Sequence, residues 1–245
     1  MPIAYARRLT GHERTLQANA QLGCFLAFIA GAINAGGFLV VHQYTSHLTG
    51  IASSMADSLA LARWGLALDG LGAIVAFLLG AATSSVLVNV ARARSLASVY
   101  AIPLLLEAVL LLGFGVAGAR DGAAGLPPGS GAPAVMLLCF IMGLQNALIS
   151  KVSRSEIRTT HITGTITDIG IELGRLAYAP AHADRRRLRL LSALATCFVA
   201  GGVAGALGFL RAGTLCTVPI AAALIVVGCV PAIDDLRKRR PEGPG

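Results

Sequence analysis

Residues 159–164 read TTHITG and residues 45–50 read TSHLTG, so a polar hexapeptide that carries a histidine occurs twice, 114 positions apart. Both copies lie between long apolar stretches. GAINA before the first copy matches GLQNA before the second, and Pro103 matches Pro219. One apolar stretch, a hexapeptide segment and two further apolar stretches therefore follow each other twice, which predicts two halves of similar structure.

The composition is that of a membrane protein. Of the 245 residues, 55% are hydrophobic and only 13% are charged, and the mean hydropathy is +0.72. A soluble domain of this length needs more polar surface to cover its core. The five cysteines lie in apolar runs without a CxxC pair, so we expect neither a disulfide framework nor a metal site. Six stretches have the roughly 20 apolar residues that a spanning helix needs: 22–42, 66–91, 99–118, 134–153, 188–210 and 214–233.

The charges indicate how the chain crosses the membrane. Arg158 and Arg175 enclose the second hexapeptide segment, which contains Asp168 and Glu172 and is therefore short and polar for a span. If neither hexapeptide segment crosses and the N-terminus is cytoplasmic, 17 of the 20 lysines and arginines lie inside. Eight spans give a weaker bias of 14 against 6. The positive-inside rule thus predicts six spans with both termini cytoplasmic.

Three spans in each half place the two halves upside down relative to each other. We therefore predict an all-α polytopic bundle of two inverted three-helix repeats, each with a re-entrant or short polar helix, and the two polar segments meet near the centre of the membrane. The expected organisation is a cytoplasmic N-terminal segment (1–20), a first membrane repeat (21–120), an extracytoplasmic linker (121–133), a second membrane repeat (134–235) and a cytoplasmic tail (236–245).

The second hexapeptide begins a stripe of polar residues. On a helix, His161, Thr165, Asp168 and Glu172 fall on one face. A histidine titrates near neutral pH, so this stripe could pass a proton. The first half repeats the shape with His47 but has serines where the second half has its two acids. The alternative is that each histidine only bonds to a neighbouring helix.

Each hexapeptide ends in Thr-Gly, with the threonine at Thr49 or Thr163. Threonine is a good N-cap, and glycine permits a sharp turn into a helix. The free N–H groups at such a helix start suit an anionic ligand. The alternative is that the threonines cap a re-entrant helix and bind nothing.

Isolated polar residues occur within the spans. Glu107 stands alone in PLLLEAVLLLGFG, where a charged carboxylate costs about 3 kcal/mol or more. It is either a proton-carrying acid or a protonated packing contact. Asn34, Gln145 and Asn146 could bind substrate or bond helices together. The runs RRRLR and LRKRR are typical of orientation signals and lipid-headgroup anchors, so no nucleic-acid partner is expected.

These residues resemble a known family. GAINAGGFLVVHQYTSHLTGIASSMAD and GLQNALISKVSRSEIRTTHITGTITDIGIELGR look like the YoaK-like family of bacterial inner-membrane proteins, which is classed as a domain of unknown function. The resemblance covers residues 20 to 235, roughly. Many members carry an acid where this chain has Asn34 and an Asn where it has Ile51. The resemblance implies a multi-pass protein of the inner (cytoplasmic) membrane and assigns no substrate.

The sequence leaves two main functional hypotheses. The first is a small, proton-linked permease for a small molecule or ion, and the second is a non-transporting membrane scaffold or accessory subunit. An intramembrane hydrolase with a metal held by His, Asp and Glu has no HExxH or GxSxG motif to support it, so we expect no enzyme and no cofactor. The expected partners are the lipid bilayer and the small-molecule or ion substrate, and the sequence leaves open whether the chain forms a homo-oligomer. The predicted substrate site comprises His47, Thr49, Asn34, Gln145, Asn146, His161 and Thr163, and the predicted proton-coupling acids are Asp168, Glu172 and Glu107.

Overall fold

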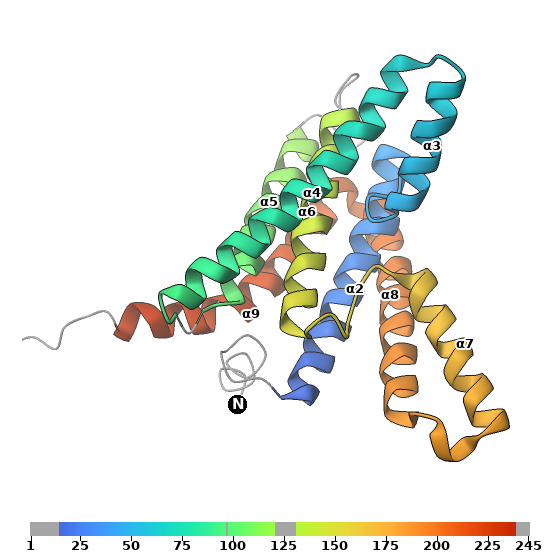
Figure 1. The fold of residues 1–245 in the computed structure, drawn as a ribbon. Helices are drawn as coiled ribbons and strands as arrows, with labels where there is room; N and C mark the ends of the chain where they lie inside the picture. The colour runs from blue at the N-terminus through green and yellow to red at the C-terminus, as the bar shows by residue number, and fades with distance from the viewer. Residues whose placement is uncertain (1–14, 97, 121–130, 239–245) are drawn as a thin grey trace, which may run out of the picture.

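The computed structural model describes residues 15–96, 98–120 and 131–238 (Figure 1). All regular elements in these ranges are helices, as the sequence predicts. They are α2 (Leu16–Val41), α3 (Leu48–Ala60), α4 (Trp64–Ala93), α5 (Ala101–Arg120), α6 (Gly131–Val152), α7 (Ile162–Tyr178), η1 (Pro180–His182), α8 (Arg185–Ala212), η2 (Gly213–Cys216) and α9 (Thr217–Lys238).

Long apolar helices give the chain the character of a multi-pass membrane protein. Five stretches of the described residues are long and apolar enough to cross a membrane. The fifth stretch is 46 residues long and contains α8, η2 and part of α9. The five stretches are Leu16–Val41, Trp64–Ala93, Ala101–Ala119, Gly131–Val152 and Arg185–Val230.

Several helices begin earlier than the apolar pattern predicts. α2 begins at Leu16 rather than at residue 22, because Thr15 caps it by accepting a hydrogen bond from the N–H of Ala18. α8 begins at Arg185 because Asp184 caps it. α6 begins at Gly131, within the expected linker 121–133. Polar residues can extend a helix beyond the apolar core. Most of that linker, and the ends of the two expected cytoplasmic segments, lie outside the described residues.

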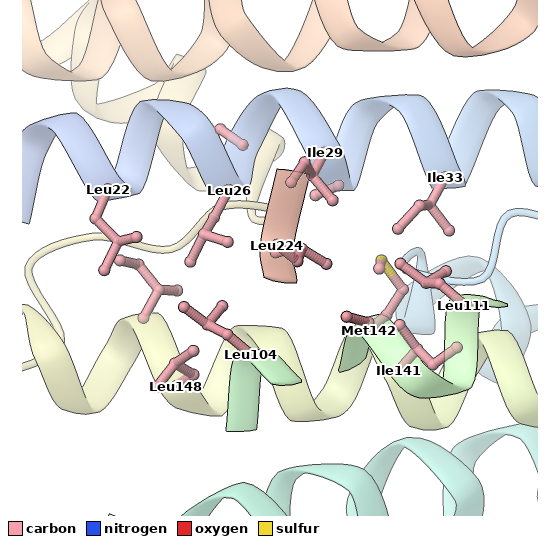
Figure 2. Close-up of a cluster of buried hydrophobic side chains, with 14 of the residues drawn as sticks. Leu22, Leu26, Ile29, Ile33, Leu104, Leu111, Ile141, Met142, Leu148 and Leu224 are labelled. Carbon is pink, nitrogen blue, oxygen red and sulfur yellow. The ribbon is translucent and has the colours of Figure 1, made fainter. Parts of the chain in front are cut away.

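The core lies between four helices. Leucine and isoleucine side chains of α2, α5 and α6 interlock there, and α9 contributes Leu224 (Figure 2). These side chains are buried, whereas α4 and α8 leave many large apolar side chains exposed. An apolar surface of that kind suits contact with lipid. The labelled core residues are Leu22, Leu26, Ile29, Ile33, Leu104, Leu111, Ile141, Met142, Leu148 and Leu224.

Four helices share a Phe-x-x-Gly pattern that determines how closely they pack. A Cβ added to Gly31 of α2 would meet the backbone oxygen of Phe198 on α8, and one added to Gly201 of α8 would meet that of Phe28 on α2. The contact is therefore reciprocal, and the backbones touch directly. α4 and α6 meet in the same way, through glycines at positions 80 and 143 and the oxygens of the two phenylalanines three residues before them. Backbone contacts of this kind are typical of tightly packed membrane helices.

Each helix pair has a counterpart in which the two halves of the chain exchange places. α2 packs along α8, and α6 packs along α4. The short helix α3 packs on α4, and α7 packs on α8. α5 and α9 pack on each other, and the hydroxyl of Thr217 donates to the backbone oxygen of Leu111 at 2.9 Å. Figure 1 shows α3 and α7 near opposite ends of the bundle.

We predict that Gly31→Ala destabilises the protein by about 1–3 kcal/mol, because the methyl group forces α2 and α8 apart. This loss exceeds the gain of about 1 kcal/mol in helix propensity that alanine brings. Denaturant unfolding of the purified protein in detergent measures the difference.

Gly113→Ala on α5 is the matched control, because nothing lies within 4 Å of its added Cβ. This control should keep or raise stability. Gly143→Ala should behave like Gly31→Ala, since it meets the oxygen of Phe77. Equal stability of all three variants would disprove the backbone contact.

Candidate functional site

The first hexapeptide folds back along the helix that precedes it. α2 ends at Val41, and the C-cap residue His42 adopts a left-handed conformation with φ of 55°. The chain then turns, and the N–H of Ser46 donates to Oδ1 of Asn34 at 3.1 Å. Asn34 lies seven residues before the end of α2, which corresponds to about 10 Å of helix. Asn34 thus holds the hexapeptide against the side of α2, about two turns before the end of that helix.

The second hexapeptide is held by the equivalent residue of α6. Asn146 Oδ1 accepts hydrogen bonds from the hydroxyls of Thr160 at 2.9 Å and Thr159 at 3.4 Å. The amide of Asn146 also donates to the backbone oxygen of Met142, which fixes its orientation. An asparagine in the long helix therefore anchors the polar segment in each half. For both residues, the structure favours helix-to-loop bonding over a free side chain.

The two hexapeptide histidines begin the short helices. His47 and His161 are the N-cap residues of α3 and α7, and neither side chain makes a capping hydrogen bond. A Cβ added to Gly50 or Gly164 would meet the imidazole three residues before it. The glycine therefore makes room for the imidazole on the first turn of the helix. The prediction that threonine is the N-cap is wrong, because the preceding histidine takes that position.

The acidic residues of α7 face the start of α8. Asp168 pairs with Arg187 at 2.8 Å, and Glu172 pairs with Arg175 at 2.8 Å. The buried carboxylate of Glu172 also accepts the N–H of Asp184 at 3.1 Å, so it holds the turn between the two helices. The predicted stripe lies on one face, but its carboxylates bond to arginines and not to His161. Their role in proton coupling stays a prediction.

Asp184 adds an N-cap to α8 at the same turn. Its carboxylate accepts from the N–H groups of Arg187 and Arg186 at 2.9 and 3.0 Å. The hydrogen bond from Arg187 lowers the pKa of Asp184 below its ordinary value of 3.8. The carboxylate is therefore charged at neutral pH. Its stabilising effect is present above the unfolded-state pKa and is lost as the pH falls through the lower folded-state value.

Glu107 and Gln145 form a pair inside the bundle. Both side chains are fully buried, and Nε2 of Gln145 donates to Oε1 of Glu107 at 3.0 Å. Oε2 of Glu107 and Oε1 of Gln145 have no hydrogen-bond partner among the described residues. A neutral carboxylic acid has one O–H donor, and the amide oxygen of Gln145 is the unused acceptor on its partner. Protonation of Glu107 would thus supply the donor that this pair lacks.

A cavity of about 460 Å³ lies beside the first hexapeptide. The end of α2, the first turns of α3 and α4, and the start of α6 enclose it. Asp69 lines it and is not among the residues predicted for the site. A lone acid near the start of an apolar stretch was the available signal. The polar lining residues are His42, Gln43, Tyr44, His47, Ser54 and Asp69.

The structure joins only some of the predicted site residues. Glu107 contacts Gln145, and each asparagine contacts the hexapeptide of its own half. No hydrogen bond or ion pair between described residues connects one hexapeptide to the other. Thr49 and Thr163 are exposed on the first turns of their helices. The meeting of the two hexapeptides at one site therefore stays a prediction.

We predict that Asn34→Leu releases the first hexapeptide, because the N–H of Ser46 loses its acceptor. An unpaired N–H of this kind costs about 1–3 kcal/mol. A cysteine at position 46 should then react faster with a polar thiol reagent. Asn34→Asp keeps an acceptor oxygen and should react as slowly as the parent. Equal rates in all three proteins would show that Asn34 does not hold the loop.

Comparison with known proteins gives a family but no activity. No curated protein and no solved structure matches the chain. A family model described as "Protein of unknown function (DUF1275)" matches residues 22–230, which include both hexapeptides and all of the helices from α3 to α8. The match confirms that the family is one of unknown function but does not test its expected YoaK-like name, and the chain belongs to the family DUF1275.

Proposed function

We propose that the protein is a small permease that moves a small solute across the membrane. The observation that carries the proposal is the pair of polar segments, each folded back against an asparagine of a long helix. Irregular polar backbone at membrane depth is stable only where protein buries it or where it lines a watery cavity. The first segment adjoins such a cavity. Broken helices of this kind form the substrate sites of many transporters.

Six spans in two inverted repeats are the architecture that we propose. The pairing of α2 with α8 and of α6 with α4 supports it, as does the pairing of α3 with α4 and of α7 with α8. If each helix of the first half is replaced by its counterpart in the second half, and the reverse, the same set of helix pairs results. The count of six treats α8 and α9 as separate spans. The charge bias favours cytoplasmic termini in a bacterial inner membrane, which also agrees with the YoaK-like resemblance.

We place the solute at the cavity beside the first hexapeptide. His47 and the first turn of α3 form one wall, and Asp69 of α4 forms another. The polar and apolar walls together suit a small polar solute. By symmetry, Thr163 and His161 would approach the solute from the other half when the transporter changes its conformation. Asn34 holds the hexapeptide beside this proposed site, and Thr49 lies on the first turn of α3 next to it.

Glu107 is the acid that we propose for proton coupling. The single hydrogen bond from Gln145 leaves one acceptor unused on each side chain. A proton on Glu107 satisfies both, so the neutral form is stable in the bundle. Loss of the proton leaves a buried charge with one donor, which favours a conformation that admits water. This difference would couple the proton to movement of the helices.

The transport prediction uses purified protein in liposomes that contain a pH-sensitive dye. A potassium diffusion potential drives proton entry, and the rate is compared with that of empty liposomes. We expect Glu107→Gln to lower the protein-dependent rate by at least about ten-fold, because a positioned proton-transfer group typically contributes that much or more. Asp57→Asn removes an exposed acid of α3 and should leave the rate unchanged.

Two outcomes contradict this proposal. An unchanged rate in Glu107→Gln would reject the role of this acid. A rate in the parent protein equal to that of empty liposomes, over a range of added small solutes, would favour a non-transporting scaffold. The ion pairs of Asp168 and Glu172 favour that second function, because they satisfy the acids of α7 without any ligand.

Thiol labelling tests the inverted arrangement. Ser53 and Thr167 occupy equivalent positions, 114 residues apart, and both are exposed. In a background without native cysteines, Ser53→Cys should react with an impermeant maleimide added outside intact cells. Thr167→Cys should react only after the membrane is opened. Reaction of both from the same side would disprove inversion.

A further inference from the structure

We propose that the groove between the starts of α2 and α8 binds the headgroup of an anionic phospholipid. A cavity of about 610 Å³ lies there, and it is separate from the cavity beside the first hexapeptide. α2 and α8 run in the same direction, since Gly23 contacts Leu194 and Gly36 contacts Phe209. Both N-terminal ends therefore lie at one end of the bundle, as Figure 1 shows.

Two arginines give this groove its charge. Arg186 and Arg189 line it, and they follow each other by one turn on the same face of α8. Neither guanidinium pairs with a carboxylate in the described part of the chain, in contrast to Arg187, which pairs with Asp168. Among the described residues, the Arg189 side chain donates only to the backbone oxygen of Arg185 in its own helix, at 3.3 Å. Unpaired arginines at a membrane surface attract lipid phosphate.

The remaining walls fit a lipid better than a soluble anion. Along α8 the face changes from Arg186 and Arg189 to Leu190 and Ala193. Along α2, after Leu16, it changes from Gln17 and Asn19 to Ala20 and Cys24 deeper in the helix. Polar residues thus lie where a headgroup would lie, and apolar residues lie where the acyl chains would begin. A free phosphate would gain nothing from the apolar part.

Glu156 also lines the groove. Its carboxylate repels a phosphate but leaves the two arginines in excess. It also distinguishes headgroups, because a headgroup with an ammonium group could pair with it. We commit to an anionic headgroup without such a group. Glu156→Gln should therefore strengthen binding of phosphatidylglycerol.

Native mass spectrometry of the full-length protein tests the site, with phosphatidylglycerol or phosphatidylcholine added to the detergent. We expect phosphatidylglycerol to bind, and the double variant Arg186→Gln, Arg189→Gln to bind it about 30-fold more weakly, as is typical for the loss of two surface arginines. The control Arg185→Gln, Arg211→Gln removes the same charge outside the groove and should keep the affinity of the parent. Phosphatidylcholine should bind weakly to all of them.

Ala193→Phe provides a test that keeps every charge. The added ring fills the apolar wall of the groove, and it should weaken lipid binding while the protein stays monodisperse. Equal binding by the groove variants and the control would overturn the site. Displacement of the lipid by inorganic phosphate, without any effect of Ala193→Phe, would overturn the lipid assignment in favour of a free anion.

Discussion

Direct contact between helix backbones determines this structure. At Gly31 and Gly201, a carbonyl oxygen of one helix occupies the space that a side chain of the other helix would otherwise fill, and α4 meets α6 in the same way. In lipid, where apolar side chains gain little from leaving the solvent, such close packing is a main source of helix association. The contact aligns α2 with α8 in parallel. It thereby brings the start of α8 beside the start of α2 and positions α7 outside that pair.

Polar groups inside the bundle follow from the same constraint. Each hexapeptide has backbone and hydroxyl groups that lipid cannot satisfy, so an asparagine on the neighbouring long helix bonds to it. Among the described residues, four buried side-chain atoms lack a partner, and two of them belong to Glu107 and Gln145. Unsatisfied buried groups are rare in folded proteins. The two unpaired oxygens of this pair therefore call for an explanation, which is either a proton on Glu107 or a second conformation of the bundle.

The sequence predicted the long apolar helices because those features depend on local patterns. It also predicted that a helix follows the second hexapeptide, although the N-cap is His161 and not Thr163. It did not predict that Asp168 bonds to Arg187, because that partner comes from another helix and no spacing rule connects them. The Phe-x-x-Gly pattern was visible in four helices. However, glycine-rich stretches indicate close packing without showing which helices pair.

The two halves share a shape but differ in how firmly their short helices are held. Asp168 and its arginine are partly exposed, so that ion pair contributes about 1 kcal/mol or less. Glu172 is buried, and its carboxylate accepts hydrogen bonds from Arg175 and from the N–H of Asp184. Removal of this carboxylate would leave the N–H of Asp184 without its acceptor, at a cost of about 1–3 kcal/mol. α3 has serines at the equivalent positions, and the hydroxyl of Ser58 donates to the backbone oxygen of Ser54 in its own helix at 2.8 Å. The α7–α8 hairpin is therefore held by the carboxylates of Asp168 and Glu172. By contrast, α3 beside the polar cavity is held by packing and by the bond of Asn34 to the preceding loop. A rearrangement that opens the bundle would thus cost less at α3 than at α7.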